Sequence, residues 1–211
     1  MNIAQSNEVI GLDLDYDMNK IAYLVKMMKS EGAWESRSDD FPFYTIGKNT
    51  YQDTLKDYFG GIKDMNMRLI GAFKGFYREV LRVLSNNECE SVLLDNSLSI
   101  PGFHIFPSHP ILKEITSPWH IDKPHEKLGL GSIHPKAYTV AIQMPKGGGG
   151  MEFARADGSS DYIRYKTGRL YIHDGQLPHR IASLRKHKEG AFRITLQGHI
   201  IRRKKQLVTF W

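Results

Sequence analysis

Cysteine is almost absent from this sequence: Cys89 is the only one in 211 residues. A single cysteine excludes an internal disulfide and any cysteine-rich metal site. A chain without disulfides suits a reducing compartment, so we expect a cytoplasmic protein. Residues 1–17 are polar and acidic and lack the basic and apolar regions of a secretory signal, which agrees with that expectation.

Long hydrophobic runs are also lacking. No apolar run approaches the roughly 18–20 residues that a membrane-spanning helix requires, so we expect no membrane partner. Hydrophobic residues make up 41% and charged residues 25% of the chain, an ordinary globular composition that excludes a disordered protein. The length suits one domain with a substantial core and is short for two. We therefore expect a single domain over residues 1–211.

Positive charge is in excess, with a net charge of +6 and a pI near 9.3. Much of it lies in two clusters, residues 185–188 and 202–205, which could attract nucleic acid or another polyanion. A solvated loop and a solvated strand end are the simpler interpretation. The sequence contains no zinc-finger spacing and no Walker loop, and the glycines 147–150 indicate a turn. The sequence thus favours a partner other than nucleic acid and leaves the oligomeric state undetermined.

The first 90 or so residues show helical periodicity. Asp17 is placed to cap a helix that carries apolar residues from Ile21 to Met28 on one face. A longer run places apolar residues from Ile62 to Leu84 at steps of three and four. Residues 32–50, rich in Gly, Pro, Ser and Asp, indicate an irregular connection. We expect a helical support region over about residues 1–90.

From about residue 91 the pattern changes to short strands separated by turns. Many short strands at regular intervals are typical of an antiparallel sandwich or barrel, and the upstream helices would then cover one face. The candidate strands are 91–95, 102–106, 117–122, 137–144, 150–155, 161–165, 169–173, 178–184, 191–201 and 206–210.

The segment from Phe192 to His199 alternates between apolar and polar residues. One face of such a strand is apolar and the other carries Arg193, Thr195 and two further polar residues. The polar face would meet water on a surface strand, or line the inside of a barrel. The segment alone leaves both interpretations open.

The chemistry is concentrated in His120-Ile121-Asp122 and in His179, which follows His120 by 59 residues. Residues two apart on a strand point to the same face, so this histidine and this aspartate can reach one ion. Two histidines and one carboxylate leave three positions open on an octahedral ion, the arrangement of non-haem iron(II) oxygenases. Zinc hydrolases commonly use a His-Glu-x-x-His helix, which is absent here. The His-x-Asp pair alone is weak evidence, because it also arises by chance.

The order His120, Asp122, His179, Arg193, Thr195 resembles the His-x-Asp…His…Arg-x-Ser/Thr signature of the 2-oxoglutarate-dependent dioxygenase superfamily. The glycine-rich stretch before Phe153 and the strand pair that leads to His179 also resemble that family, so the likeness covers roughly residues 100–201. It implies a mainly β fold, a double-stranded β-helix or jelly roll over about residues 91–211, backed by the N-terminal helical layer.

The resemblance also implies the cofactors, Fe(II), 2-oxoglutarate as co-substrate and O2. His120, Asp122 and His179 would be the metal ligands and catalytic residues. Arg193 and Thr195 would bind the distal carboxylate of 2-oxoglutarate, since a buried anion requires a compensating charge and an arginine fork meets a carboxylate with two hydrogen bonds. Because the carboxylate of Asp122 is present where related halogenases have a small residue, hydroxylation is the default reaction. Desaturation, epoxidation and ring formation stay open.

The prime substrate is not identified by the sequence. We expect a small molecule or an amino-acid-type compound, and cations that flank the ligands, Lys123 and Arg180, slightly favour an anionic one. The alternatives are a catalytically silent jelly-roll binding protein and an oxygenase acting on nucleic acid. Either Tyr138 or Tyr171 could contact the co-substrate. Among the other histidines, His173 is interpreted as a strand end. Two are interpreted as structural, His104 and His109, and three as solvated, His125, His134 and His187.

Overall fold

The computed structural model describes residues 9–40, 42–113, 117–131, 134–146, 148–183 and 190–211. The basic cluster at 185–188, including His187, lies outside these residues. Strands in the described part of the chain are β1 (Ile10–Asp13), β2 (Glu35–Ser36), β3 (Tyr44–Ile46), β4 (Val92–Leu94), β5 (Gly102–Pro107), β6 (Lys136–Gln143), β7 (Met151–Ala154), β8 (Ser160–Ile163), β9 (Arg169–Asp174), β10 (His179–Ile181), β11 (Phe192–Arg203) and β12 (Gln206–Phe210).

The two long helices begin where capping side chains satisfy their first N–H groups. Helix α1 (Met18–Ser30) is capped by Asp17, whose carboxylate accepts from the N–H groups of Asn19 and Lys20, as the sequence predicted. Helix α2 (Leu55–Glu88) is capped by Thr54. A 3-10 turn (Pro110–Lys113) and the short helix α3 (Pro124–Lys127) follow. None of the described helices combines the length and apolarity that a bilayer crossing requires.

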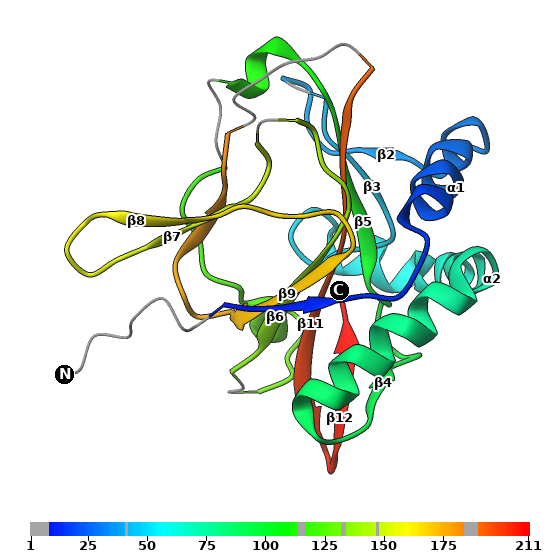
Figure 1. Cartoon of the computed structure of the whole chain (residues 1–211). Helices are drawn as coiled ribbons and strands as arrows, with labels where there is room; N and C mark the ends of the chain where they lie inside the picture. The colour runs from blue at the N-terminus through cyan, green and yellow to red at the C-terminus, as the bar shows by residue number, and fades with distance from the viewer. Residues whose placement is uncertain (1–8, 41, 114–116, 132–133, 147, 184–189) are drawn as a thin grey trace.

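The strands form two sheets. The larger has the order β1-β9-β6-β11-β5-β3-β2, with β12 beside β11 and β4 beside β12; the smaller has the order β10-β7-β8. All pairs are antiparallel except β12 with β4. Between β5 and β11 the chain passes back and forth between the two sheets. Figure 1 shows both long helices on one side of the larger sheet and the β7–β8 hairpin on the other. The fold is therefore mainly β with a helical layer, as expected.

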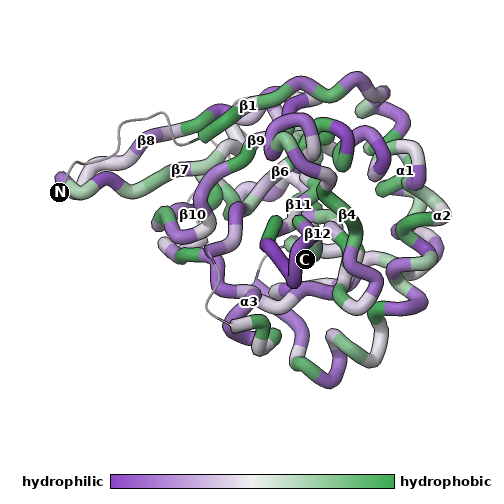
Figure 2. The backbone as a smooth tube through the Cα atoms, turned by 90° about the horizontal axis from the view of Figure 1, so that it is seen from below, coloured by the Kyte–Doolittle hydropathy of each residue, from purple (hydrophilic) through white to green (hydrophobic). Residues whose placement is uncertain are grey.

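The main core lies between the helices and the larger sheet. Phe73 and Phe76 of α2 and Val25 of α1 are buried in one cluster with Ile194 and Leu196 of β11. Figure 2 shows that both helices carry hydrophobic and hydrophilic residues, as expected for helices with one buried face. Because side chains alternate along a strand, Arg193 and Thr195 lie on the opposite face of β11, toward the smaller sheet. The polar face of this strand thus lines the interior, the second of the two interpretations left open above.

Two expectations about the strands were wrong. Residues 117–122 do not form a strand: only a single bridge joins His120 to His179 in the described residues. The N-terminal region is also not purely helical, because β1, β2 and β3 join the larger sheet, and β2 and β3 fall inside the expected connection 32–50. These strands are two to four residues long. Such short strands depend on distant partners and leave little periodicity in the sequence.

Candidate functional site

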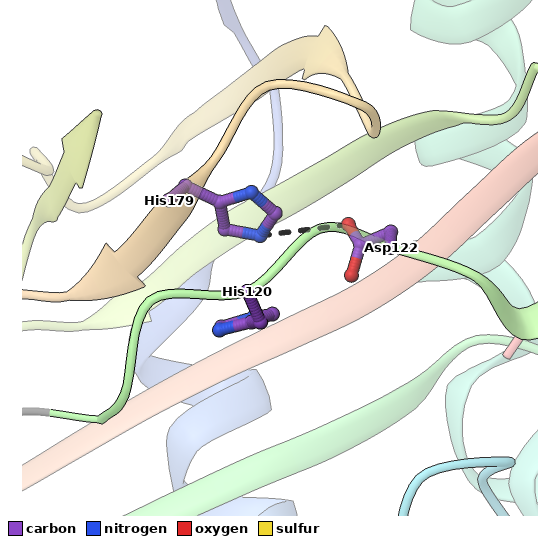
Figure 3. Close-up of side chains that lie close together, drawn as sticks. All are labelled: His120, Asp122 and His179. Carbon is purple, nitrogen blue, oxygen red and sulfur yellow. Dashed lines mark ion pairs between the residues drawn. The ribbon is translucent and has the colours of Figure 1, made fainter. Parts of the chain in front are cut away.

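The predicted ligands are brought together by backbone pairing between two segments. The N–H of His120 donates to the carbonyl of His179 at 3.0 Å, and the N–H of His179 donates back at 2.9 Å. Two residues on, the N–H of Asp122 donates to the carbonyl of Gly175 at 2.7 Å. This pairing fixes the loop that carries His120 and Asp122 against β10 and the turn before it. The three side chains consequently share one location (Figure 3).

The three side chains are spaced for a single ion. Each residue offers a ligand atom, and these atoms all lie within 4.8 Å of one another. Nε2 of His179 lies 3.5 Å from Oδ2 of Asp122, the pair joined by the dashed line in Figure 3. Asp122 and His179 are buried, and His120 is the least buried of the three. Two imidazoles and one carboxylate at this spacing fit a first-row divalent metal.

Both histidine rings are oriented by backbone carbonyls. Nδ1 of His120 contacts the carbonyl of Pro118 at 2.9 Å, and Nδ1 of His179 contacts the carbonyl of Leu177 at 2.7 Å. A carbonyl can only accept, so each Nδ1 carries the proton and each Nε2 presents a lone pair. Metal-binding histidines are commonly held in this way, because the outer hydrogen bond fixes the tautomer.

The carboxylate of Asp122 is surrounded by polar groups. The hydroxyl of Tyr51 donates to Oδ1 at 2.8 Å, and Nε2 of His199 lies 3.5 Å from Oδ2. Burial by itself raises the pKa of this carboxyl group, but the imidazoles of His199 and His179 outweigh burial and hold the pKa below its usual range. Asp122 is therefore ionised at neutral pH, the form in which a carboxylate binds a metal.

Several residues near this cluster were not expected there. His173 forms the end of β9 as predicted, but its ring is buried against that of His179, with centroids 4.6 Å apart. Tyr51 and His199 contact Asp122. Tyr51 was not singled out from the sequence, and His199 was expected only as part of the polar face of the strand that begins at Phe192. His125 is buried, so its interpretation as a solvated residue was wrong; the first turn of α3 faces the body of the molecule.

The predicted ligands line a cavity of about 510 Å³ that also contains Arg193. One wall is formed by the stacked rings of Phe43 and Phe106, whose centroids are 4.5 Å apart. The cavity is mostly apolar, with a few polar groups at defined positions, as is usual for small-molecule sites. Its other lining residues include Arg37, Asn49, Tyr51, His104, Leu112, Thr139, Met151, His173, Ile181, Gln197 and His199.

Arg193 is fully buried and its charge is not compensated. Nε donates to the carbonyl of Gly149 at 2.9 Å and one terminal nitrogen lies 3.4 Å from the hydroxyl of Thr195. The other terminal nitrogen has no hydrogen-bond partner among the described residues, and none of their carboxylates pairs with the guanidinium. Burial lowers the pKa of Arg193 to about 10, so the group stays charged at neutral pH. A buried cation of this kind indicates a site for an anionic ligand.

The tyrosines considered from the sequence make other contacts. The hydroxyl of Tyr138 bonds to that of Thr209, and the hydroxyl of Tyr171 accepts from the N–H of Lys166. Tyr165 instead lies beside Arg193, with its ring centroid 5.9 Å from the guanidinium carbon. The sequence offered no signal for Tyr165, because its position depends on the turn between β8 and β9.

Comparison with solved structures finds this fold among 2-oxoglutarate-dependent oxygenases. The chain aligns over 97% of its length with 86% of an N-substituted L-amino acid dioxygenase from Burkholderia ambifaria AMMD in complex with alpha-ketoglutarate (2-oxoglutarate), at 13% identity and a TM-score of 0.58. It aligns over 94% of its length with 94% of a Pseudomonas putida prolyl-4-hydroxylase, at 14% identity and a TM-score of 0.50. A third similar structure is the non-haem alpha-ketoglutarate-dependent carbocyclase SnoK from nogalamycin biosynthesis, with 92% of this chain and 82% of that one covered at 9% identity and a TM-score of 0.51.

No family model matches the sequence, and no curated protein is detectably similar to it. At the identities of the solved structures, the likeness establishes the fold. The chain thus shares its fold with solved structures described as a prolyl-4-hydroxylase, an N-substituted L-amino acid dioxygenase and a non-haem alpha-ketoglutarate-dependent carbocyclase. The resemblance seen in the sequence is thus confirmed at the level of the fold.

The buried charge of Arg193, which has no carboxylate partner among the described residues, leads to a prediction about the free energy of unfolding. We expect Arg193→Met to raise the free energy of unfolding of the ligand-free protein by about 1–4 kcal/mol, because methionine removes a buried charge that has no partner. The measurement is urea unfolding without carboxylate ligands. The matched control is Arg37→Met: Arg37 also lines the cavity, but it contacts Asp53 at 2.8 Å with both side chains less than a tenth exposed. Its loss should destabilise by about 3–5 kcal/mol. Equal destabilisation by Arg193→Met and Arg37→Met would contradict the conclusion that the charge of Arg193 is not compensated.

Proposed function

We propose that the protein is an Fe(II)- and 2-oxoglutarate-dependent oxygenase. In this proposal His120, Asp122 and His179 hold the metal, and Arg193 with Thr195 binds the distal carboxylate of 2-oxoglutarate. The observation that carries the proposal is that one cavity contains both a two-histidine, one-carboxylate cluster and a buried guanidinium that has no carboxylate partner among the described residues. The co-substrate is a ligand that suits both, since one end chelates a metal and the other is an anion.

We also propose that the two sheets are the halves of a double-stranded β-helix within one domain. The support is the way the chain alternates between them: β5, β6, β9 and β11 lie in the larger sheet, while β7, β8, β10 and the bridge at His120 belong to the smaller one. Strands β1 and β3 extend the larger sheet, and the helices cover it. In this arrangement the proposed metal ligands would lie between the two sheets.

The roles of the residues follow from their positions. The metal, when bound, supplies the redox chemistry that couples oxidative decarboxylation of 2-oxoglutarate to oxidation of the substrate by O2. His120, Asp122 and His179 would hold the metal and would leave positions on it for other ligands. Arg193 and Thr195 fix the far end of the co-substrate, so that its keto acid end is oriented toward the metal. The apolar wall of Phe43 and Phe106 keeps water away from this interior.

The prime substrate is proposed to be a small molecule or an amino-acid-type compound. A cavity of about 510 Å³ suits ligands of that size, and the similar Burkholderia structure is described as an N-substituted L-amino acid dioxygenase. The preference for an anionic substrate is weakened. Lys123 pairs with Glu126 and Arg180 with Glu152, and neither cation lines the cavity. Hydroxylation is the reaction that we propose. The similar structure described as a carbocyclase shows that a protein of this fold can be described with a different reaction.

The alternatives receive less support. For a nucleic-acid substrate, the basic cluster at 202–205 would have to be free, but Arg202 pairs with Glu90 and Arg203 with Asp95. In a catalytically silent binding protein we would expect the loss of a metal ligand or of the arginine. This chain retains all three proposed ligands and Arg193. Succinate release from 2-oxoglutarate, tested over a panel of amino-acid-type compounds and small molecules, separates the oxygenase from the silent protein.

The metal assignment predicts the effect of removing each ligand. Under anaerobic conditions the wild-type protein should bind one Fe(II) per chain, and His120→Ala, Asp122→Ala or His179→Ala should each remove most of that binding, because three donors are needed on one face of the ion. Isothermal titration calorimetry measures it. His173→Ala is the control, since His173 lines the same cavity without being a proposed ligand. If His173→Ala alone abolished binding while the other three variants kept it, the ligand set would be wrong.

The co-substrate assignment predicts graded losses. Arg193→Met removes the partner of a buried carboxylate, which should cost about 2–5 kcal/mol of 2-oxoglutarate binding, or roughly thirtyfold or more in affinity. Thr195→Val removes a neutral donor and should cost about 1 kcal/mol. Equilibrium binding of 2-oxoglutarate to the Mn(II)-loaded proteins provides the measurement. Unchanged affinity in Arg193→Met would refute the role given to this arginine.

A further inference from the structure

Tyr51 reaches the proposed metal site from a distant part of the chain. Its hydroxyl donates to Oδ1 of Asp122 at 2.8 Å across 71 residues of sequence, and it lies 3.5 Å from Nε2 of His199. The side chain lines the cavity although 45% of it is exposed. Its hydroxyl end therefore faces the site while other parts of the residue meet solvent.

The turn that carries Tyr51 is held by a dense set of hydrogen bonds. Oδ1 of Asn49 accepts from the N–H groups of Tyr51 and Gln52 at 3.0 and 2.9 Å. The carboxylate of Asp53 accepts from the N–H of Asn49 at 2.7 Å and pairs with Arg37 at 2.8 Å. A turn fixed at both ends limits the positions that the tyrosine can adopt, so its hydrogen bond to Asp122 requires little further ordering.

The contact distinguishes the two oxygens of the carboxylate. Oδ1 is occupied by the tyrosine hydroxyl, whereas Oδ2 faces Nε2 of His179 and Nε2 of His199, each at 3.5 Å. A carboxylate that bound the metal through both oxygens would use an additional coordination position. Two open positions are needed for the keto acid end of the co-substrate and one for oxygen, so a second carboxylate oxygen would compete with them.

We infer that Tyr51 is a positioning residue of the metal site, whose hydroxyl holds Oδ1 of Asp122 so that Oδ2 alone is presented to the ion. This inference rests on the proposed function, because it requires Asp122 to be a ligand. Hydrogen bonds to ligating carboxylates of this kind typically change metal affinity or activity by about 10–100-fold when removed.

The test uses Tyr51→Phe, which removes the hydroxyl and keeps the ring. The probe is Co(II) alone, added to the metal-free protein and followed by calorimetry and by its visible absorption, which changes with the number of ligating oxygens. We expect Co(II) binding to weaken about tenfold or more and the spectrum to change. The metal-free protein should still unfold cooperatively, with its midpoint lowered by the loss of one hydrogen bond to a buried carboxylate. The matched control is Tyr23→Phe, a tyrosine of α1 that is 62% exposed, which should behave as wild type.

Co(II) affinity within about threefold of wild type, or an unchanged spectrum, would overturn the inference. Loss of cooperative unfolding in metal-free Tyr51→Phe would overturn it as well, because the tyrosine would then act on the fold as a whole. Asp122→Ala separates this failure from that of the proposed function. If Asp122→Ala loses Co(II) binding while Tyr51→Phe keeps it, only the role of Tyr51 falls; if Asp122→Ala also binds normally, the metal site itself is misassigned.

Discussion

Burying a guanidinium without a carboxylate beside it is costly, and the rest of the structure is arranged around that cost at Arg193. Its strand, β11, lies between β5 and β6, so the backbone of this segment is hydrogen-bonded on both sides. Ile194 and Leu196, on the other face of the same strand, are fully buried under the helices. The favourable burial on one face holds the charged residue in place on the other. An anionic ligand would then supply the missing partner, so that binding and stability are linked at one residue.

The cluster of proposed metal ligands depends on a different kind of constraint. His120 and His179 come from segments far apart in sequence, and they meet because their backbones exchange two hydrogen bonds. The contacts of their Nδ1 atoms with backbone carbonyls use the same local segments, so the loop geometry that brings the residues together also selects the nitrogen that each ring presents. The side chain of Asp122 is held separately, by Tyr51. The backbones of the two histidines thus determine their position, whereas the tautomers and the orientation of the carboxylate are determined by groups outside the proposed ligand set.

The features that could be predicted from the sequence were local in origin. The cap at Asp17 and the alternation along β11 depend on neighbours within a few residues, and both were confirmed. The predicted ligands were found together because a short motif identifies them. The positions of Tyr51 and His173 could not be predicted, since each depends on packing between elements that are distant in sequence. Residues 117–122 form a single bridge for the same reason. The bridge depends on one residue of β10 that is distant in sequence, and the apolar and polar pattern of residues 117–122 does not indicate it.

The central claim is that the metal cluster and Arg193 bind the two ends of one molecule of 2-oxoglutarate. The most direct measurement is the visible spectrum of the anaerobic Fe(II)-loaded protein on addition of 2-oxoglutarate or of succinate, which has the carboxylates but lacks the keto group. The account predicts a weak charge-transfer band with 2-oxoglutarate and none with succinate, because only the keto acid can chelate the iron while its distal carboxylate meets Arg193. Saturating binding of 2-oxoglutarate to the iron-loaded protein without such a band would contradict it.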